Sequence, residues 1–306
     1  MAEPLSFRRE MDFAYAEPKE MAPGVLRVVA GNPGPFTYKG TNSYLVGTKS
    51  LALIDPGPDD PAHLKALLAA AAGRPITHIV VTHTHRDHVD GLPAALAATG
   101  ARTAGYGAYE YTSQVAARDT GSGDGGGRSA RTWMPDIVLR DGDRLAGDDW
   151  SLEAVHTPGH TPDHLAFALS GRGVLFSGDH VMAWNTSIVA PPEGRMGDYN
   201  RSLEKLMGRE VDTVYFPGHG GRIEAPQRTA KAYLLHRRMR EQAIHDAIVG
   251  GARSIDDVVA EVYRGLDPRL IPAAALSTLA HVEHLGERGL VRFALPLSQE
   301  SALSAA

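Results

Sequence analysis

The segment His83-Thr84-His85-Arg86-Asp87-His88 places four metal-binding side chains within six residues. It follows Ile76 to Val81, a short apolar run whose β-branched residues predict a buried strand. In an extended chain His83 and His85 point to the same side, so both can bind one metal ion. After a turn, Asp87 and His88 can face a second ion nearby. The spacing therefore predicts the start of a two-metal site.

Three later candidates each stand directly after an apolar run that predicts a strand. They are His160 in Thr157 to Thr161, Asp179 in Phe176 to Asp179, and His219 in Phe216 to Gly220. A glycine precedes each of them and allows the chain to turn tightly. Strand ends are held rigidly by a sheet while they stay open to a groove. Each residue alone could equally be structural, but together with the first segment they indicate one site.

Composition limits the chemistry of such a site. The chain has no cysteine, which excludes disulfides, thiolate metal sites and a cysteine nucleophile. Histidine and carboxylate ligands suit two divalent ions, with zinc favoured and manganese or iron as alternatives. The net charge of −5 gives no broad attraction to nucleic acid.

The sequence also carries expectations about location. No run of about 18 apolar residues appears, so no membrane span is expected. Met1 to Pro23 lacks the apolar core of a secretory signal and contains several acids. We therefore expect a cytoplasmic location.

Strands and helices occur in both halves of residues 1–226, which predicts an α/β (α+β) fold, a helix–sheet–sheet–helix (αββα) sandwich. Residues 227–306 differ in character. A long helical pattern at Gln227 to Ile248 precedes a helix capped by Ser254, a third helix at Pro272 to Glu287, and a short strand. This order predicts a C-terminal winged-helix-like domain. Between the two halves of the sandwich, the glycine-rich stretch Thr120 to Ser129 predicts a loop rather than a phosphate cradle.

The motif order resembles that of the metallo-β-lactamase superfamily. The match involves Leu53 to Gly57, His83 to His88, His160, Asp179 and His219, over roughly Val25 to Ile223. The resemblance implies the αββα metallo-β-lactamase sandwich and a ligand set. The first ion would be bound by His83, His85 and His160, the second by Asp87, His88 and His219, and Asp179 would bridge them. Asp55 would lie beneath the site and orient ligands.

Two bridged ions imply hydrolysis. Such ions would lower the pKa of a bound water toward neutrality and so supply a hydroxide that can attack a carbonyl or phosphoryl centre. Asp87 and Asp179 are therefore the expected catalytic carboxylates.

Flanking segments narrow the class of hydrolase. Asn32 to Pro35, Gly40 to Gly47, Thr157 to His164 and the winged-helix-like tail resemble the β-lactamase-like protein 2 family of endoribonucleases. This resemblance implies hydrolysis of phosphodiesters in single-stranded RNA. A thioester hydrolase of the glyoxalase II type uses the same ligand set and stays as the alternative, together with other ester or lactone hydrolases that act on a small metabolite. A metal-binding DNA regulator without activity is a third, less favoured hypothesis.

Other side chains have weaker predicted roles. His164 could donate a proton or support His160, and Trp184 and Tyr199 could stack on a base, although aromatic residues are more often core. Five basic residues on the long helix could contact RNA phosphates or simply face solvent: Arg228, Lys231, Arg237, Arg238 and Arg240. Pro272 to Glu287 is not basic, so strong duplex DNA binding is not expected. A wall of the groove or a homodimer contact is the expected role of that helix.

Overall fold

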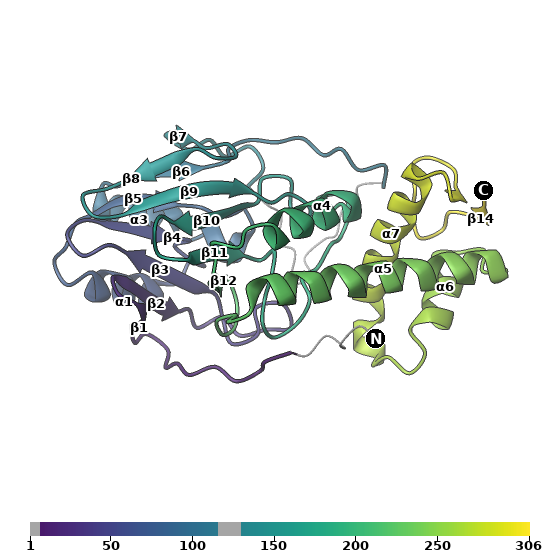
Figure 1. Ribbon diagram of the computed structural model, residues 1–306, viewed down its shortest axis with the longest axis horizontal. Helices are drawn as coiled ribbons and strands as arrows, with labels where there is room; N and C mark the ends of the chain where they lie inside the picture. The colour runs from purple at the N-terminus through teal and green to yellow at the C-terminus, as the bar shows by residue number, and fades with distance from the viewer. Residues whose placement is uncertain (1–6, 116–129) are drawn as a thin grey trace.

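The computed structural model describes residues 7–115 and 130–306, so the predicted loop at Thr120 to Ser129 lies outside the described residues. Two β-sheets pack face to face, and helices cover their outer surfaces (Figure 1). The αββα sandwich predicted from the sequence is confirmed. Within the described residues, no helix has both the length and the apolar character needed to cross a membrane.

The first sheet has seven strands in chain order. Neighbours pair antiparallel up to β4 and in parallel from β4 to β7. The strands are β1 (Lys19–Ala22), β2 (Val25–Val29), β3 (Asn42–Val46), β4 (Leu51–Ile54), β5 (Ile76–Val80), β6 (Arg102–Gly105) and β7 (Ile137–Val138). Strands β3 and β4 are buried along their whole length because both faces of the sheet are covered.

The second sheet has five strands in the order β12-β11-β10-β9-β8. They are β8 (Arg144–Ala146), β9 (Ser151–His156), β10 (Leu165–Leu169), β11 (Val174–Gly178) and β12 (Val214–Pro217). Only the β11–β12 pair is parallel, because helix α4 connects these two strands. The apolar run Val211 to Phe216 predicts a strand, but β12 begins only at Val214, and Val211 is 73% exposed.

The core lies between the sheets. Aromatic rings from both sheets meet there, with the ring of Tyr44 stacked on Phe216 at 5.9 Å and tilted against Phe176 at 5.1 Å. Helices α1 (Pro61–Ala71) and α3 (Leu92–Thr99) cover the first sheet through buried residues such as Leu67 and Ala95. Asp59 and Asp60 are both candidate caps of helix α1, and the structure selects Asp60, whose carboxylate accepts from the backbone N–H of Ala62.

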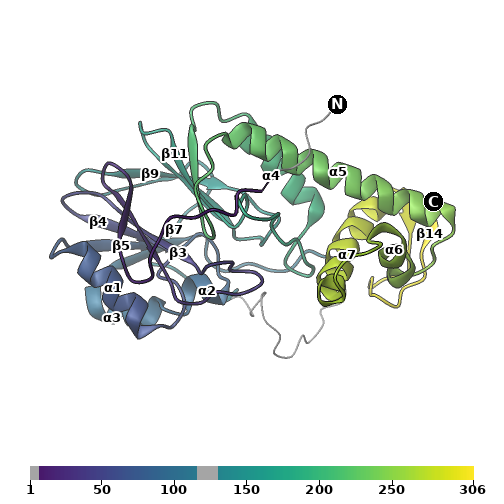
Figure 2. The ribbon, with the colours of Figure 1, turned by 90° about the horizontal axis from the view of Figure 1, so that it is seen from below.

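Helices α4 (Met196–Met207) and α5 (Pro226–Gly250) cover the second sheet (Figure 2). The sequence pattern predicts the first of these helices from Tyr199 to Met207, and α4 begins three residues earlier, at Met196. Helix α5 contributes to two cores: Tyr233 packs with α4 on the second sheet, while Ile244 and Ile248 pack among the C-terminal helices. The proposed domain boundary after residue 226 therefore falls at the start of a shared helix.

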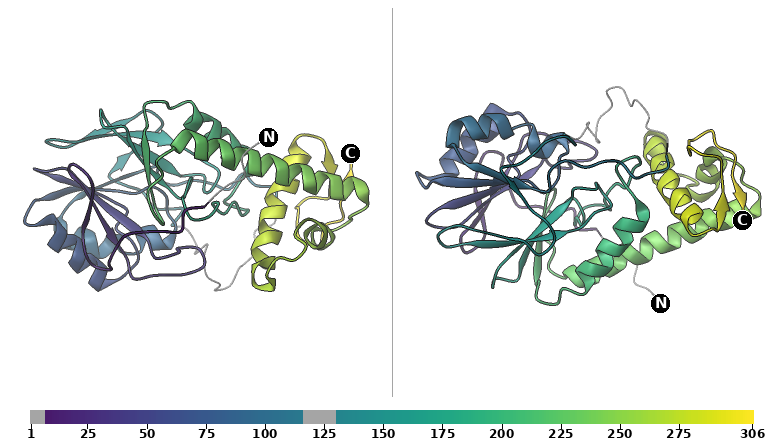
Figure 3. Two further views of the ribbon diagram at one scale, coloured as in Figure 1. Left: turned by 60° about the horizontal axis from the view of Figure 1, so that its bottom comes forward. Right: turned by 90° about the horizontal axis from the view of Figure 1, so that it is seen from above.

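The C-terminal part lies at one end of the sandwich (Figure 3). It contains α6 (Ile255–Val262), the 3-10 turn Pro268–Leu270, α7 (Ile271–Glu287), and the two-stranded sheet of β13 (Val291–Arg292) and β14 (Ser304–Ala305). Ser254 caps α6 as predicted, accepting from the N–H of Asp257. The order of helices and the final hairpin agree with the predicted winged-helix outline.

Candidate metal centre

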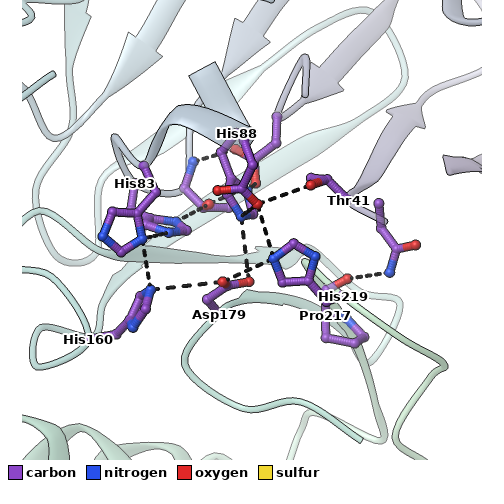
Figure 4. A network of polar contacts seen from close by, with 12 residues as sticks. Thr41, His83, His88, His160, Asp179, Pro217 and His219 are labelled. Carbon is purple, nitrogen blue, oxygen red and sulfur yellow. Dashed lines mark hydrogen bonds and ion pairs between the residues drawn. The ribbon is translucent and has the colours of Figure 1, made fainter. Parts of the chain in front are cut away.

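All seven predicted ligands lie at one edge of the sandwich (Figure 4). The segment from His83 to His88 follows β5, near the middle of the first sheet, and its last residues form the short helix α2 (Arg86–Val89). His160 lies in the β9–β10 loop, Asp179 follows β11 and His219 follows β12. Ends of both sheets thus supply the site, which is why residues far apart in sequence meet there.

The first cluster consists of three histidine rings. Nδ1 of His85 lies 3.0 Å from Nε2 of His83 and 3.1 Å from Nε2 of His160. All three residues are buried, with between 1% and 8% of each residue's surface exposed. The three nitrogens converge on one point, as the ligands of a single ion must.

The opposite nitrogen of each of these rings meets an acceptor. Nδ1 of His83 lies 3.0 Å from the Thr82 hydroxyl, which itself donates to Asp55, and Nδ1 of His160 lies 2.7 Å from the Ile188 carbonyl. Nε2 of His85 lies 2.9 Å from the Glu193 carboxylate. Each outer nitrogen must therefore donate its N–H, so the converging nitrogens of the neutral rings carry lone pairs. Lone pairs that face one another need a cation.

The second cluster combines carboxylates with two further rings. Oδ2 of Asp87 lies 3.3 Å from Nε2 of His88 and 3.2 Å from Nε2 of His219. In these rings too, the nitrogen that faces away from the centre donates to a protein acceptor. Nδ1 of His88 donates to Asp55 at 2.8 Å, and Nδ1 of His219 donates to the Gly40 carbonyl at 3.3 Å. The arrangement repeats that of the first cluster.

Asp179 stands between the two clusters. Its Oδ2 lies 3.2 Å from Nε2 of His219 and 3.8 Å from Nε2 of His160, and its Oδ1 lies 3.6 Å from Nε2 of His88. Nε2 of His88 and Oδ1 of Asp179 are both buried without a hydrogen-bond partner. An unpaired buried polar atom costs free energy. Metal ions at this place would satisfy both atoms, so the residues fit a two-metal centre.

The pKa values of the rings differ within the first cluster, because burial opposes charge on His85 but the Glu193 carboxylate outweighs it and raises the pKa of His85 alone. Burial lowers the pKa of His83 well below its ordinary value and that of His160 to about 4, which keeps both rings neutral. Burial also opposes charge on His219, but Asp179 and Asp87 outweigh it and raise the pKa of His219 to about 9. Without metal, a proton on His219 balances the carboxylates. Metal binding would release that proton.

Residues of the first sheet hold the second cluster. The Thr41 hydroxyl donates to Oδ2 of Asp87 at 3.0 Å, and the side-chain amide of Asn42 donates to the carbonyls of Pro217 and Gly220, both at 2.9 Å. These last two bonds fix the turn that carries His219. Asn42 and Thr41 had no predicted role in the site.

Two predicted roles need correction. Tyr199 is fully buried, and its hydroxyl donates to the His180 carbonyl at 2.7 Å, so its ring has no free face for a base. His164 is also fully buried. Its Nδ1 contacts the Thr157 hydroxyl at 2.8 Å, and its Nε2 accepts the backbone N–H of Asp179 at 3.1 Å. These contacts indicate that His164 holds the backbone of Asp179.

Two other predictions on binding groups have mixed outcomes. Trp184 stacks on Tyr38, with ring centroids 4.9 Å apart, and is partly exposed beside Gly220, next to His219. A role in substrate binding stays a prediction. Among the basic residues of α5, Arg237 is only 4% exposed and points toward the Ser187 carbonyl. The five cations therefore do not form one exposed stripe.

Two carboxylates near the site, Glu193 and Asp163, were not predicted as part of it. Glu193 contacts His85, and Asp163 accepts from the backbone N–H and the hydroxyl of Thr84 at 3.0 and 2.8 Å. Glu193 lies 108 residues from His85, and neither acid stands in a strand-end motif like those of the predicted ligands. Only the fold brings them to the ligand segment.

Buried histidines and carboxylates converging at one edge of an αββα sandwich define a class of metal-dependent hydrolases. The chain belongs to the metallo-β-lactamase superfamily, whose family model matches residues 37–219. A second model, the β-lactamase-associated winged helix domain, matches residues 254–294. Both parts of the predicted architecture are thereby confirmed.

Similar proteins span most of the chain. A Drosophila melanogaster protein named β-lactamase-like protein 2 homolog is 31% identical over 90% of this chain and 92% of its own. An atrochrysone carboxyl ACP thioesterase from Claviceps purpurea is 29% identical over 80% of this chain and 74% of its own. The crystal structure of a β-lactamase domain protein from Burkholderia ambifaria has a TM-score of 0.78 and 22% identity, and covers 97% of this chain and 96% of its own. This structure supports the fold.

Proposed function

We propose that this protein is a two-metal hydrolase that cleaves phosphodiester bonds in single-stranded RNA. One observation carries the metal-dependent part: every ligand histidine donates its outer N–H to a protein acceptor and turns its other nitrogen toward the shared centre. The ion contacts would be made by His83, His85 and His160 on one side, by Asp87, His88 and His219 on the other, and by Asp179 between them.

Two bound ions would supply a nucleophile at neutral pH and neutralise charge on the group that is attacked. The protein's own residues fix the geometry. Asp55 and Glu193 orient rings on the two sides of the centre, and His164 holds the backbone of Asp179. In this proposal residues 1–226 form the catalytic domain and residues 227–306 the winged-helix domain. Zinc is the favoured metal, because histidine nitrogens make up most of the ligand set.

The choice of RNA has separate support. Segments that flank the ligands resemble β-lactamase-like protein 2 endoribonucleases, and the match to the Drosophila protein includes 92% of that protein's length. A thioester substrate is the second candidate, and the similarity to the Claviceps thioesterase favours it. Both substrates present a carbonyl or phosphoryl centre to the same metals.

A side-by-side assay tests the proposal. Protein loaded with zinc, manganese or iron is given labelled single-stranded RNA, bis-p-nitrophenyl phosphate and a glutathione thioester. We expect cleavage of the RNA and the phosphodiester, which chelation of the metal abolishes, and no cleavage by Asp179→Asn. Rapid thioester cleavage with both phosphodiesters intact would overturn the RNA proposal and favour the second candidate.

A further inference from the structure

The loop between Asp179 and α4 reaches His85 through Glu193. Among the hydrogen bonds of the described residues, no other bond joins this loop to His85. Oε2 of Glu193 lies 2.9 Å from Nε2 of His85, while Nδ1 of the same ring faces the first cluster. Both side chains are largely buried, with 10% of His85 and 15% of Glu193 exposed. A buried carboxylate that accepts from the outer nitrogen of a ligand fixes the ring's orientation and raises its basicity.

Glu193 is in turn held by the segment Tyr111 to Val115. The Tyr111 hydroxyl donates to Oε1 of Glu193 at 3.2 Å, so the two carboxylate oxygens have different partners. Two residues after Glu193, the guanidinium of Arg195 donates to the Thr112 hydroxyl at 2.9 Å. The loop that carries Glu193 is thus bonded at two points to one short stretch of chain.

That stretch is fixed to the C-terminal domain. The buried carboxylate of Glu283, on α7, accepts from the Ser113 hydroxyl at 2.8 Å and from the backbone N–H of Gln114. Val115 forms an isolated bridge with Leu297. Arg195 also pairs with Glu287, one turn after Glu283 on the same helix. A continuous series of polar contacts therefore leads from α7 to His85.

We infer that Glu193 is a positioning residue for His85. The C-terminal domain sets the position of Glu193 through the contacts of α7 with residues 111–115. The inference rests on the proposed metal centre, but not on the identity of the substrate. The winged-helix domain then has a structural role in the first metal cluster, in addition to any contact with substrate. Among the described residues, the outer nitrogens of the second cluster are held instead by Asp55 and Gly40, in loops of the first sheet.

The test separates the two clusters. Cobalt(II) or zinc is titrated into metal-free protein, and the two binding steps are followed by calorimetry and by the cobalt electronic spectrum. We expect Glu193→Ala to weaken one of the two steps by about 10- to 100-fold and to leave the other unchanged. Glu193→Gln keeps an acceptor oxygen without the charge, so its effect should be smaller. Tyr111→Phe should have the smallest effect.

The contribution of α7 is tested with Ser113→Ala and Glu283→Ala, which should weaken the same step as Glu193→Ala. The matched control is Glu204→Gln on α4, an exposed carboxylate that pairs with Arg238 away from the centre. It should change neither step. Thermal unfolding of the metal-free variants identifies any general loss of stability.

Equal weakening of both steps, or unchanged binding in Glu193→Ala, would overturn the inference. If Glu193→Ala selectively weakens one step while Ser113→Ala and Glu283→Ala bind metal normally, the part of the inference that involves α7 is wrong. Failure of the RNA assay leaves these titrations interpretable, because they measure metal alone. The absence of any metal binding by the unaltered protein would instead defeat the proposed function.

Discussion

Oδ2 of Asp55 lies 2.8 Å from Nδ1 of His88, and both side chains are almost completely buried. The same oxygen accepts the Thr82 hydroxyl at 2.7 Å, which in turn faces Nδ1 of His83 at 3.0 Å. One carboxylate therefore orients a ring of each cluster, directly or through one hydroxyl. Asp55 also has a left-handed backbone with φ of 52°, a conformation that asparagine tolerates well.

We expect Asp55→Asn to fold and to bind metal more weakly. The amide keeps the backbone conformation and one acceptor oxygen, but it removes the negative charge opposite the His88 N–H. Loss of such a partner costs about 10- to 100-fold in metal affinity. Calorimetric titration of zinc measures the change, and circular dichroism checks the fold. Unaltered affinity would show that Asp55 does not orient the ligands.

Gly218→Ala should disable the centre although no ligand is removed. A Cβ at Gly218 would lie 2.4 Å from Oδ1 of Asp179 and 2.8 Å from Cε1 of His88. Both ligands would have to shift, and a misplacement of about 1 Å near reacting groups costs on the order of 100-fold in rate. Hydrolysis of bis-p-nitrophenyl phosphate and metal content measured by mass spectrometry report the result.

Gly250→Ala is the matched control, because a Cβ there meets no atom within 4 Å. Gly250 ends α5, far along the chain from the ligands. We expect full activity in Gly250→Ala. If Gly218→Ala is also fully active, the crowded geometry of the centre is contradicted.

The pH dependence of stability should reveal a buried ionic group between α5 and α7. Glu241 accepts from His284 at 2.7 Å, from His281 at 3.3 Å and from Arg288 at 2.7 Å. Burial alone would raise the pKa of Glu241, but the hydrogen bonds from His281 and His284 lower it to about 2. Burial lowers the pKa of His281 to about 4, so near neutral pH that ring donates in its neutral form.

A carboxyl with a lowered pKa in the folded state stabilises the protein above its ordinary pKa of 4.5. This contribution is lost as the pH falls from about 4.5 toward 2. We expect the difference in unfolding free energy between the unaltered protein and Glu241→Gln to be on the order of 3 kcal/mol near pH 7. Urea unfolding at a series of pH values gives this difference, which should shrink with acidification. A difference independent of pH would contradict the assignment.

Trp184→Ala should raise KM for single-stranded RNA by about tenfold, because stacking on one base contributes about 1–3 kcal/mol. The ring already stacks on Tyr38 and is partly exposed beside Gly220, so one aromatic platform remains available to substrate. Trp184→Phe should change KM by no more than about twofold. An effect on kcat alone, or on thermal stability alone, would show that Trp184 only packs against Tyr38.

Most of the site could be predicted from the sequence because each ligand stands at a strand end, where the hydrophobic pattern and a glycine reveal its place. The residues that orient these ligands could not. Glu193 and Asp163 reach the centre only through the fold, and no spacing rule connects them to His85 or Thr84. For Tyr199 the sequence left two roles open, base stacking or a core position, and its place on α4 puts the ring in the core that covers the second sheet.

The two sheets contribute different ligands to the same centre. His83 to His88 follow the first sheet, whereas His160, Asp179 and His219 follow the second. Bound ions would therefore act as a cross-link between the two halves of the sandwich in a chain that has no disulfide. In hydrogen-exchange terms, the amides at the ends of β5 and β12 would be protected more strongly in the metal-loaded protein than after chelation. Metal loading would thus add to the coupling that the shared core already gives the two sheets.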